Sequence, residues 1–247
     1  MSQSLGDRQK SYETLTERSI SSSDGWLMAR ADGHNFSKFT KKFDKPFDQR
    51  FAESMRKTCE DLLTSSYQIV TVYTQSDEIT MIFDRVISEH SEPEKYQPYP
   101  FNGRLQKLSS LLAGFISVRF CHHMKLEDPS AHFDCRVFLV PRKEEVFNNT
   151  LWRYQDGYRN AISAIAQSLY SHKQLHKKTT GEKIAMIGSL DAYGSSCLHG
   201  VFFKKVQYEK DTEGGKCIRV RVDRFVQKIE GYDPTFNDVL LAKYRDS

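Results

Sequence analysis

The feature that most constrains the fold is the segment TVYTQSDEITMIF, residues 71–83. It contains two short runs of β-prone residues joined by a polar connector, which is typical of a β-hairpin. Asp77 and Glu78 stand side by side at the tip of this hairpin. Two adjacent carboxylates at such a tip indicate either an ordinary polar turn or a functional edge of a sheet.

The elements around this hairpin predict a small sheet covered by helices. The apolar run at 26–31 predicts a strand that ends just before Asp32 and Gly33. A helix is predicted within 47–67, where Asp48 lies in the first turn and favours the positive end of the helix dipole. A second helix is predicted from Arg104 to about residue 122, and a third strand at 133–141. The order strand, helix, hairpin, helix, strand predicts an α+β fold with a ferredoxin-like core.

The remaining segments predict additions to this core. Residues 88–103 are polar and proline-rich, so we expect a surface loop. A helix is predicted from Lys143 onward, interrupted near Gly157, and two strands flanking DTEGG at 211–215 predict a C-terminal β-hairpin.

Composition restricts the class of protein. Hydrophobic residues make up 38% and charged residues 28%, which is typical of a soluble globular chain. No apolar run approaches the roughly 20 residues of a membrane span, and the polar start resembles no secretory signal, so we expect a cytoplasmic protein without membrane contact. Five scattered cysteines without a CxxC pair favour reduced thiols over disulfides or a zinc cluster.

Asp32 and Asp77 are the candidate metal ligands. If the first strand and the hairpin are neighbours, the two carboxylates converge, and Mg²⁺ is usually held by one or two carboxylates together with waters and phosphates. Gly33 lacks a side chain, so its backbone carbonyl could also reach an ion. His34 is not assigned as a ligand because Mg²⁺ prefers oxygen. The alternative is that the Asp-Gly pair and the hairpin tip are only turns.

Several motifs in order resemble one family. They are LGDRQKSYE, RADGHNFSKFTKKFDKPFD, YTQSDEITMIF, GRLQKLSSLLAGF, FDCRVFLVP, WRYQDGYRNAI and LHKKTTGEK. From residue 5 to about residue 205 the chain looks like the tRNA(His) guanylyltransferase family, particularly its like-protein branch. The resemblance implies a core similar to the polymerase palm, extension of RNA in the 3′-to-5′ direction, and a homotetramer built as a dimer of dimers. It also implies that residues 1–142 form the palm-like catalytic core with a two-metal site, and that residues 143–247 form a helical and hairpin extension packed on it.

The resemblance assigns roles to individual residues. Asp32, Asp77 and Glu78 match the catalytic carboxylates, and Asp32, Gly33 and Asp77 match the metal site for two Mg²⁺ ions. The expected nucleotide-binding residues are Arg30, Lys45, Asp48, Ser76, Arg104, Lys107, Arg136 and Asn160. Independently, Arg104 and Lys107 are three apart on a predicted helix and share a face, so together they could hold one polyanion, or they are ordinary solvated surface.

The implied reaction has two steps. A 5′-monophosphate on the RNA attacks the α-phosphate of ATP or GTP, and the 3′-hydroxyl of an incoming nucleoside triphosphate then attacks the activated 5′ end. Enzymes specific for tRNA(His) carry His-Ile-Asn-Asn where this chain reads Tyr158, Arg159, Asn160 and Ala161, so template-directed repair of 5′-truncated tRNA is favoured. Lys177, Lys178, Lys183, Lys204 and Lys205 are candidate contacts to tRNA, with solvated surface as the alternative.

Three other functions stay open. A nucleotidyl cyclase would use the same carboxylates without RNA. A nontemplated guanylyltransferase would add G to tRNA(His) whatever the opposing base. A non-catalytic RNA-binding module would gain nothing from carboxylates clustered towards phosphate.

Overall fold

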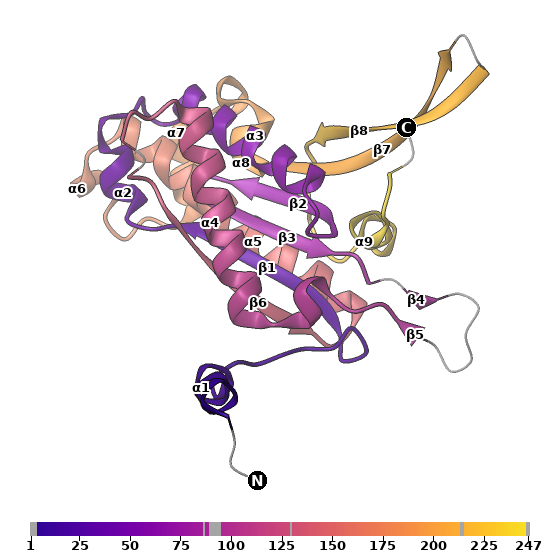
Figure 1. Cartoon of the computed structure of the whole chain (residues 1–247). Helices are drawn as coiled ribbons and strands as arrows, with labels where there is room; N and C mark the ends of the chain where they lie inside the picture. Colours follow the sequence, from indigo (N-terminus) through magenta and orange to yellow (C-terminus); the bar gives the residue numbers. More distant parts are fainter. Residues whose placement is uncertain (1–3, 86, 89–94, 129, 213–214, 246–247) are drawn as a thin grey trace.

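A six-stranded antiparallel sheet forms the centre of the molecule (Figure 1). The computed structural model describes residues 4–85, 87–88, 95–128, 130–212 and 215–245. The strand order is β6-β1-β3-β2-β7-β8, in which the first four strands have the ferredoxin-like arrangement. The predicted core fold is therefore confirmed. The strands are β1 (Trp26–Gly33), β2 (Ile69–Gln75), β3 (Glu78–Phe83), β6 (Phe133–Val140), β7 (Val201–Thr212) and β8 (Gly215–Phe225).

One face of the sheet is covered by α3 (Gln49–Thr64) and α4 (Leu105–Met124). Alternate residues of each strand point to this face because side chains in a strand alternate. Leu27, Ala29 and Ala31 of β1 are fully buried there, in one cluster with the apolar residues of α3 and α4. The helix α3 begins where Asp48 caps it, since the Asp48 Oδ1 accepts the backbone N–H of Phe51 at 3.0 Å.

The opposite face is covered by α5 (Lys143–Leu169) and α9 (Pro234–Leu241). The predicted break of α5 near Gly157 is wrong, because the helix is continuous across this residue. Gly157 serves a packing role instead: a Cβ atom there would lie 2.1 Å from the Gln75 Oε1. The glycine therefore lets α5 pass close over the end of β2, where the Gln75 amide donates to the carbonyl of Leu198 at 2.7 Å.

The segment predicted as a surface loop is partly structured. Two-residue strands β4 (Ile87–Ser88) and β5 (Lys95–Tyr96) pair with each other, and residues 89–94 lie outside the described residues. Tyr99 is buried, and its hydroxyl donates to the Gly25 carbonyl at 2.8 Å while accepting the Leu27 N–H at 3.1 Å. The segment thus anchors the start of β1.

The other elements lie outside these two layers. They are α1 (Leu5–Thr14), α2 (Phe36–Phe39), η1 (Thr40–Lys42), η2 (Pro100–Gly103), α6 (His172–Leu175), α7 (Thr180–Ile187), η3 (Asp191–Tyr193) and α8 (Ser195–His199). The β7–β8 hairpin extends away from the body (Figure 1). The strand β7 pairs with β2, so a single sheet contains residues from both sides of residue 142. The division into a core of residues 1–142 and an extension of residues 143–247 stays a prediction. None of the helices in the described part of the chain has both the length and the apolar character of a membrane span.

Candidate active site

The two predicted metal-binding aspartates, Asp32 and Asp77, come together at one end of the central strands, which we call the carboxylate edge. Asp32 lies opposite Glu78 in the β1–β3 ladder, and Asp77 occupies the β2–β3 turn. The N–H of Gly33 donates to the carbonyl oxygen of Asp77 at 3.2 Å, which ties the end of β1 to this turn. Ser76 has φ of 54°, in the left-handed region that a tight turn requires. The hairpin geometry thus brings Asp77 beside Asp32.

The electrostatics of Asp77 favour a cation at this edge. Burial raises the pKa of Asp77 above its ordinary value, and the negative charge of Asp32 raises it further. The opposing contribution comes from hydrogen bonds, including one from the Ser76 hydroxyl at 3.0 Å. No basic side chain among the described residues forms an ion pair with Asp77. Two carboxylates without a counter-charge are therefore a suitable donor set for Mg²⁺.

A metal ion at the carboxylate edge would have few protein ligands. Within the described ranges, no three His, Cys, Asp or Glu side chains cluster as a metal site. Mg²⁺ is typically bound by one or two carboxylates, with waters and substrate phosphates completing the shell. The missing Cβ of Gly33 is explained by packing, since it would lie 2.4 Å from the ring of Phe36. Its backbone carbonyl as a ligand stays a prediction.

Glu78 has a different environment from the two aspartates. Its Oε1 accepts from Arg153 Nε at 2.6 Å, and its Oε2 lies 3.9 Å from Arg30 Nε. Burial raises the pKa of Glu78 even though both arginines act to lower it. The carboxylate therefore joins β3 to α5, and a catalytic role for Glu78 stays a prediction. The sequence did not reveal Arg153, whose only local signal is Asp156 one helical turn later.

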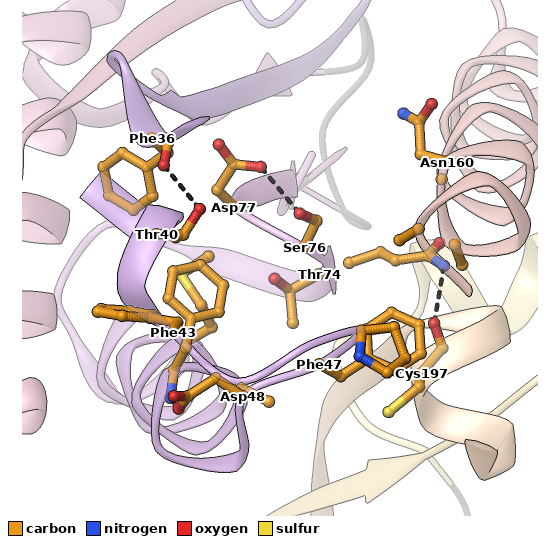
Figure 2. A pocket seen from close by; sticks show the side chains of 18 of the residues that line it. Phe36, Thr40, Phe43, Phe47, Asp48, Thr74, Ser76, Asp77, Asn160 and Cys197 are labelled. Carbon is orange, nitrogen blue, oxygen red and sulfur yellow. Dashed lines mark hydrogen bonds between the residues drawn. The ribbon is translucent and has the colours of Figure 1, made fainter. Parts of the chain in front are cut away.

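A cavity of about 400 Å³ opens beside Asp77 (Figure 2). It gathers five predicted site residues from three distant segments of the chain, namely Lys45, Asp48, Ser76, Asp77 and Asn160. Figure 2 shows Asp77 and Ser76 on one side and Asn160 on the helix at another side. Apolar walls come from Phe36, Phe43, Phe47, Phe51 and Met55. Aromatic walls next to polar groups are typical of a pocket for a small polar ligand.

Two predicted nucleotide contacts already have partners inside the protein. Burial alone would raise the pKa of Asp48, but the N–H donors of the first turn of α3, above all Phe51, hold it below its ordinary value. Lys45 is exposed and its Nζ donates to the Thr40 carbonyl at 3.1 Å. The sequence reading missed Arg56, which also lines the cavity and donates to Ser196 Oγ at 3.1 Å.

The four predicted arginine and lysine contacts outside the cavity divide into two groups. Arg30 and Arg136 are opposite each other in the β1–β6 ladder, on the same face as Asp32. Arg104 and Lys107 lie at the start of α4. The strand β6 follows the end of α4, and its first residues pair with the end of β1, where Asp32 lies. Arg104 and Lys107 are therefore at the end of α4 that is remote from the carboxylates. Arg104 is 3.6 Å from Glu17, and Lys107 lies over the ring of Phe101. Within a single chain, Arg104 and Lys107 therefore do not reach the carboxylate edge.

The predicted RNA-binding lysines also divide. Lys177 and Lys183 line a cavity of about 530 Å³ together with His172 and His176. Lys178 pairs with Glu182 at 2.9 Å. The assignment of Lys204 is wrong, because this side chain is fully buried and donates to Thr71 Oγ1 at 2.9 Å and to the carbonyl of Ala242. Lys205 is half-buried, and burial lowers its pKa.

Comparison with known proteins decides the family. Residues 6–141, more than half of the chain, match the family model described as "Thg1: tRNAHis guanylyltransferase". The chain belongs to this family of nucleotidyltransferases. The predicted resemblance to the Thg1 family is thereby confirmed.

Relatives of known sequence extend the match. An uncharacterized protein, R259, of Acanthamoeba polyphaga mimivirus is 31% identical over 97% of this chain and 90% of its own length. The tRNA(His) guanylyltransferase of Debaryomyces hansenii is 29% identical over 56% of this chain. That match spans about half of the Debaryomyces hansenii protein, 52% of its length.

Solved structures agree with the Thg1 fold. A bacterial Thg1-like protein in complex with GTP has a TM-score of 0.75 and 28% identity, covering 90% of this chain and 91% of that one. A bacterial Thg1-like protein in complex with ATP has a TM-score of 0.73 and 30% identity, over 89% and 92% of the two chains.

Proposed function

We propose that this protein extends the 5′ end of truncated tRNA in the 3′-to-5′ direction, selecting each nucleotide by pairing with the opposite strand. The observation that carries the proposal is the cavity beside Asp77, because it brings Lys45, Ser76 and Asn160 from distant segments to a pair of uncompensated carboxylates. Membership of the Thg1 family and the nucleotide complexes of the two bacterial Thg1-like proteins support it.

The chain supplies binding groups on both sides of the carboxylate edge. A nucleoside triphosphate would enter the main cavity, with its base between the phenylalanine walls and its phosphates towards Lys45 and Ser76. Arg30 and Arg136 would hold phosphates of the other reactant on the sheet face that carries Asp32. Asp32, Asp77 and the Gly33 carbonyl would hold two Mg²⁺ ions, which when bound supply charge neutralisation and in-line alignment at the reacting phosphate.

The proposed reaction proceeds by two substitutions at phosphorus. An oxygen of the RNA 5′-monophosphate attacks the α-phosphorus of ATP or GTP, the bond to the β-phosphate breaks, and pyrophosphate leaves. The 3′-hydroxyl of the incoming nucleoside triphosphate then attacks the 5′ phosphorus of the RNA, loses its proton, and displaces the nucleoside monophosphate. The protein contributes positioning and charge rather than a covalent intermediate.

The environment of Tyr158 favours templated addition over nontemplated addition of G. Tyr158 occupies the first position of the run that is His-Ile-Asn-Asn in enzymes specific for tRNA(His). Its ring stacks on His199 with centroids 5.4 Å apart and an interplanar angle of 13°. His199 in turn bonds to the Tyr154 hydroxyl at 2.7 Å through Nδ1. Because Tyr158 is engaged in this stack, we expect no specific reading of tRNA(His) from this position.

The proposal includes a cytoplasmic homotetramer. Arg104 and Lys107 are remote from the carboxylates of their own chain, so a role in phosphate binding would require them to reach the substrate of a neighbouring copy. We expect a tetramer by light scattering, and loss of nucleotide addition on dilution to monomer.

The test is extension of RNA of defined length. The protein is incubated with Mg²⁺, ATP, the four nucleoside triphosphates and a 5′-labelled tRNA lacking its first nucleotide, beside full-length tRNA(His). We expect only the pairing nucleotide to be added to the truncated tRNA. Addition of G to full-length tRNA(His) opposite any base would replace templated repair by nontemplated guanylylation. Extension of neither RNA, or cyclic nucleotide formation without RNA, would overturn the proposal.

A further inference from the structure

A half-exposed tryptophan lies among arginines beside the carboxylate edge. Trp152 of α5 is 50% exposed. The guanidinium carbon of Arg153 lies 4.4 Å from the centre of its ring, and that of Arg30 lies 5.8 Å away. The chain has one other tryptophan, Trp26, which is partly buried against the second core cluster. An exposed apolar ring alone is ordinary, so its surroundings decide the argument.

The contact with Arg30 places Trp152 at the reaction site. Arg30 and Asp32 are two residues apart on β1 and share a face, so their Cα atoms are separated by roughly 7 Å. The residue after Trp152, Arg153, binds Glu78 directly opposite Asp32. The ring is therefore held at the reaction site by two arginines that themselves contact the carboxylate Glu78.

Trp152 is on a different side of the site from the main cavity. It is not one of the residues lining that cavity, whereas Asn160 is, about 12 Å further along α5. The proposed reaction joins two reactants, and the cavity can hold one nucleotide. The surface of Trp152, Arg30 and Arg136 is therefore available for the second reactant.

The charges on this surface suit a terminal phosphate next to a base. Arg153 is neutralised by Glu78 and Asp156, at 2.6 and 2.8 Å. Arg136, directly opposite Arg30, is exposed and forms no ion pair with any residue that the structure describes. The carboxylates on this face are those of Glu78, 3.9 Å from Arg30, and of Asp32 and Asp134, which lie opposite each other two residues away from Arg30 and Arg136. An unpaired arginine beside an open aromatic face is the combination that recognises an unstacked nucleotide.

We propose that Trp152 stacks on the base of the nucleotide at the 5′ end of the RNA, while Arg136 and Arg30 hold its phosphate. This inference rests on the proposed function and adds to it the residue that binds the RNA end. The same chemistry could serve the base of a free nucleoside triphosphate, so the experiment separates the two sources.

Tryptophan fluorescence tests the stacking without any reaction. In W26F, Trp152 is the only tryptophan, and in W152F, Trp26 is. Each variant is titrated, without Mg²⁺, with a 5′-phosphorylated RNA hairpin whose 5′ nucleotide is paired and whose opposite strand extends one nucleotide further, as in a truncated tRNA, and separately with ATP. We expect saturable quenching of W26F by the hairpin and no response of W152F. Absence of quenching in W26F, or equal quenching by ATP alone, would overturn the assignment to the RNA end.

Kinetics supply the second readout. Stacking of one base on an aromatic ring predicts an increase of the KM for RNA in W152A of about 5- to 150-fold. We expect W152F to stay within about threefold of wild type, because a smaller ring still stacks. Y232A is the control, since Tyr232 is 49% exposed and lies against Phe147 and not on this surface. An unchanged KM in a folded W152A contradicts the inference even if the enzyme extends RNA; if wild type extends no RNA, the proposed function fails while the fluorescence titration still decides the stacking.

Discussion

Two side chains of opposite charge, Asp77 and Lys204, show how differently this fold treats a charge that it removes from water. Burial raises the pKa of Asp77 and lowers the pKa of Lys204 to about 7, so both are shifted towards their neutral forms. Lys204 is sealed beneath α9, where its Nζ donates to the Thr71 hydroxyl and the Ala242 carbonyl. Asp77 faces an open cavity and the like charge of Asp32.

The difference distinguishes a structural site from a binding site. Lys204 has neutral hydrogen-bond partners within the protein, and burial lowers its pKa although the charge of Asp84 acts to raise it, so a deprotonated amine is satisfied without any ligand. Asp77 has a hydroxyl partner but no counter-charge among the described residues, and its surroundings include a second carboxylate. A shifted pKa alone would mark both residues as candidates for a functional site. Only Asp77 lies beside a cavity and so has room for a ligand.

The largest expected effect comes from removing the charge of Asp77. Asn has the same shape but no charge, so D77N should reduce nucleotide addition by about a thousandfold or more, since charge stabilisation of the transition state is lost. The variant should unfold at the same or a higher temperature, because a buried charge beside Asp32 is removed. Single-turnover rates and thermal unfolding measure the two effects.

The control for this variant is D134N. Asp134 is exposed and lies opposite Asp32 in the β1–β6 ladder, so it tests whether any nearby carboxylate would have the same effect. We expect D134N to keep addition within about fivefold of wild type. More than a tenth of the wild-type rate in D77N would show that Asp77 is not part of the reaction.

The ion pair between Arg153 and Glu78 is a third case, in which a buried charge has a counter-charge within the protein. Arg153 and Glu78 are 11% and 17% exposed and their atoms are 2.6 Å apart. R153M leaves Glu78 poorly compensated and should lower the free energy of unfolding by about 3 kcal/mol. R159M, at an exposed pair with Asp156, should change it by less than about 1 kcal/mol. Urea denaturation measures both, and equal small effects would show that the α5–β3 ion pair contributes little.

The cavity wall itself can be tested at Gly157. A Cβ there would lie 2.1 Å from the Gln75 amide, so G157A should lower the free energy of unfolding by about 1–3 kcal/mol and raise the KM for the nucleotide. G114A is the matched control on α4, where nothing lies within 4 Å of the added methyl group. That variant should be more stable by about 0.5–1 kcal/mol. If both substitutions stabilise, α5 does not need close contact with β2.

Sequence reasoning predicted the parts of this fold that depend on local periodicity. The order of strands and helices followed from apolar patterns of period two and 3.6, and Asp32 and Asp77 followed from their positions at the ends of strands. The continuity of α5 at Gly157 was missed because a helical glycine is unfavourable locally, and only the neighbouring Gln75 explains it.

The misassigned Lys204 has a different physical reason. In VFFKK, residues 201–205, one of the two lysines must share a face with Phe202, because strand residues alternate. Both faces of β7 are covered near β2, which no pattern within five residues can show. Likewise, Arg104 and Lys107 share a helix face as predicted, but only the topology reveals that their end of α4 is remote from the carboxylates.

The smallest effect, and the sharpest test of the comparison, concerns the pH dependence at Lys204. Burial lowers its pKa to about 7 in the folded protein, against the ordinary lysine value of 10.5, so between these values the unfolded chain binds more protons than the native state. The free energy of unfolding should therefore rise with pH from about 7 to about 10.5, and this contribution should be constant below pH 7.

In K204M this rise should be absent, since methionine does not titrate and fills a similar volume. At pH 7 we expect the two proteins to differ by no more than about 1 kcal/mol, because a well-packed apolar residue can replace a buried charge at little cost. By pH 9.5 the wild type should have gained on the order of 1–3 kcal/mol relative to K204M. Urea denaturation at pH 7 and 9.5 measures this difference. Parallel pH profiles would mean that Lys204 stays protonated beneath α9. The contrast between a neutral buried Lys204 and Asp77 would then fail.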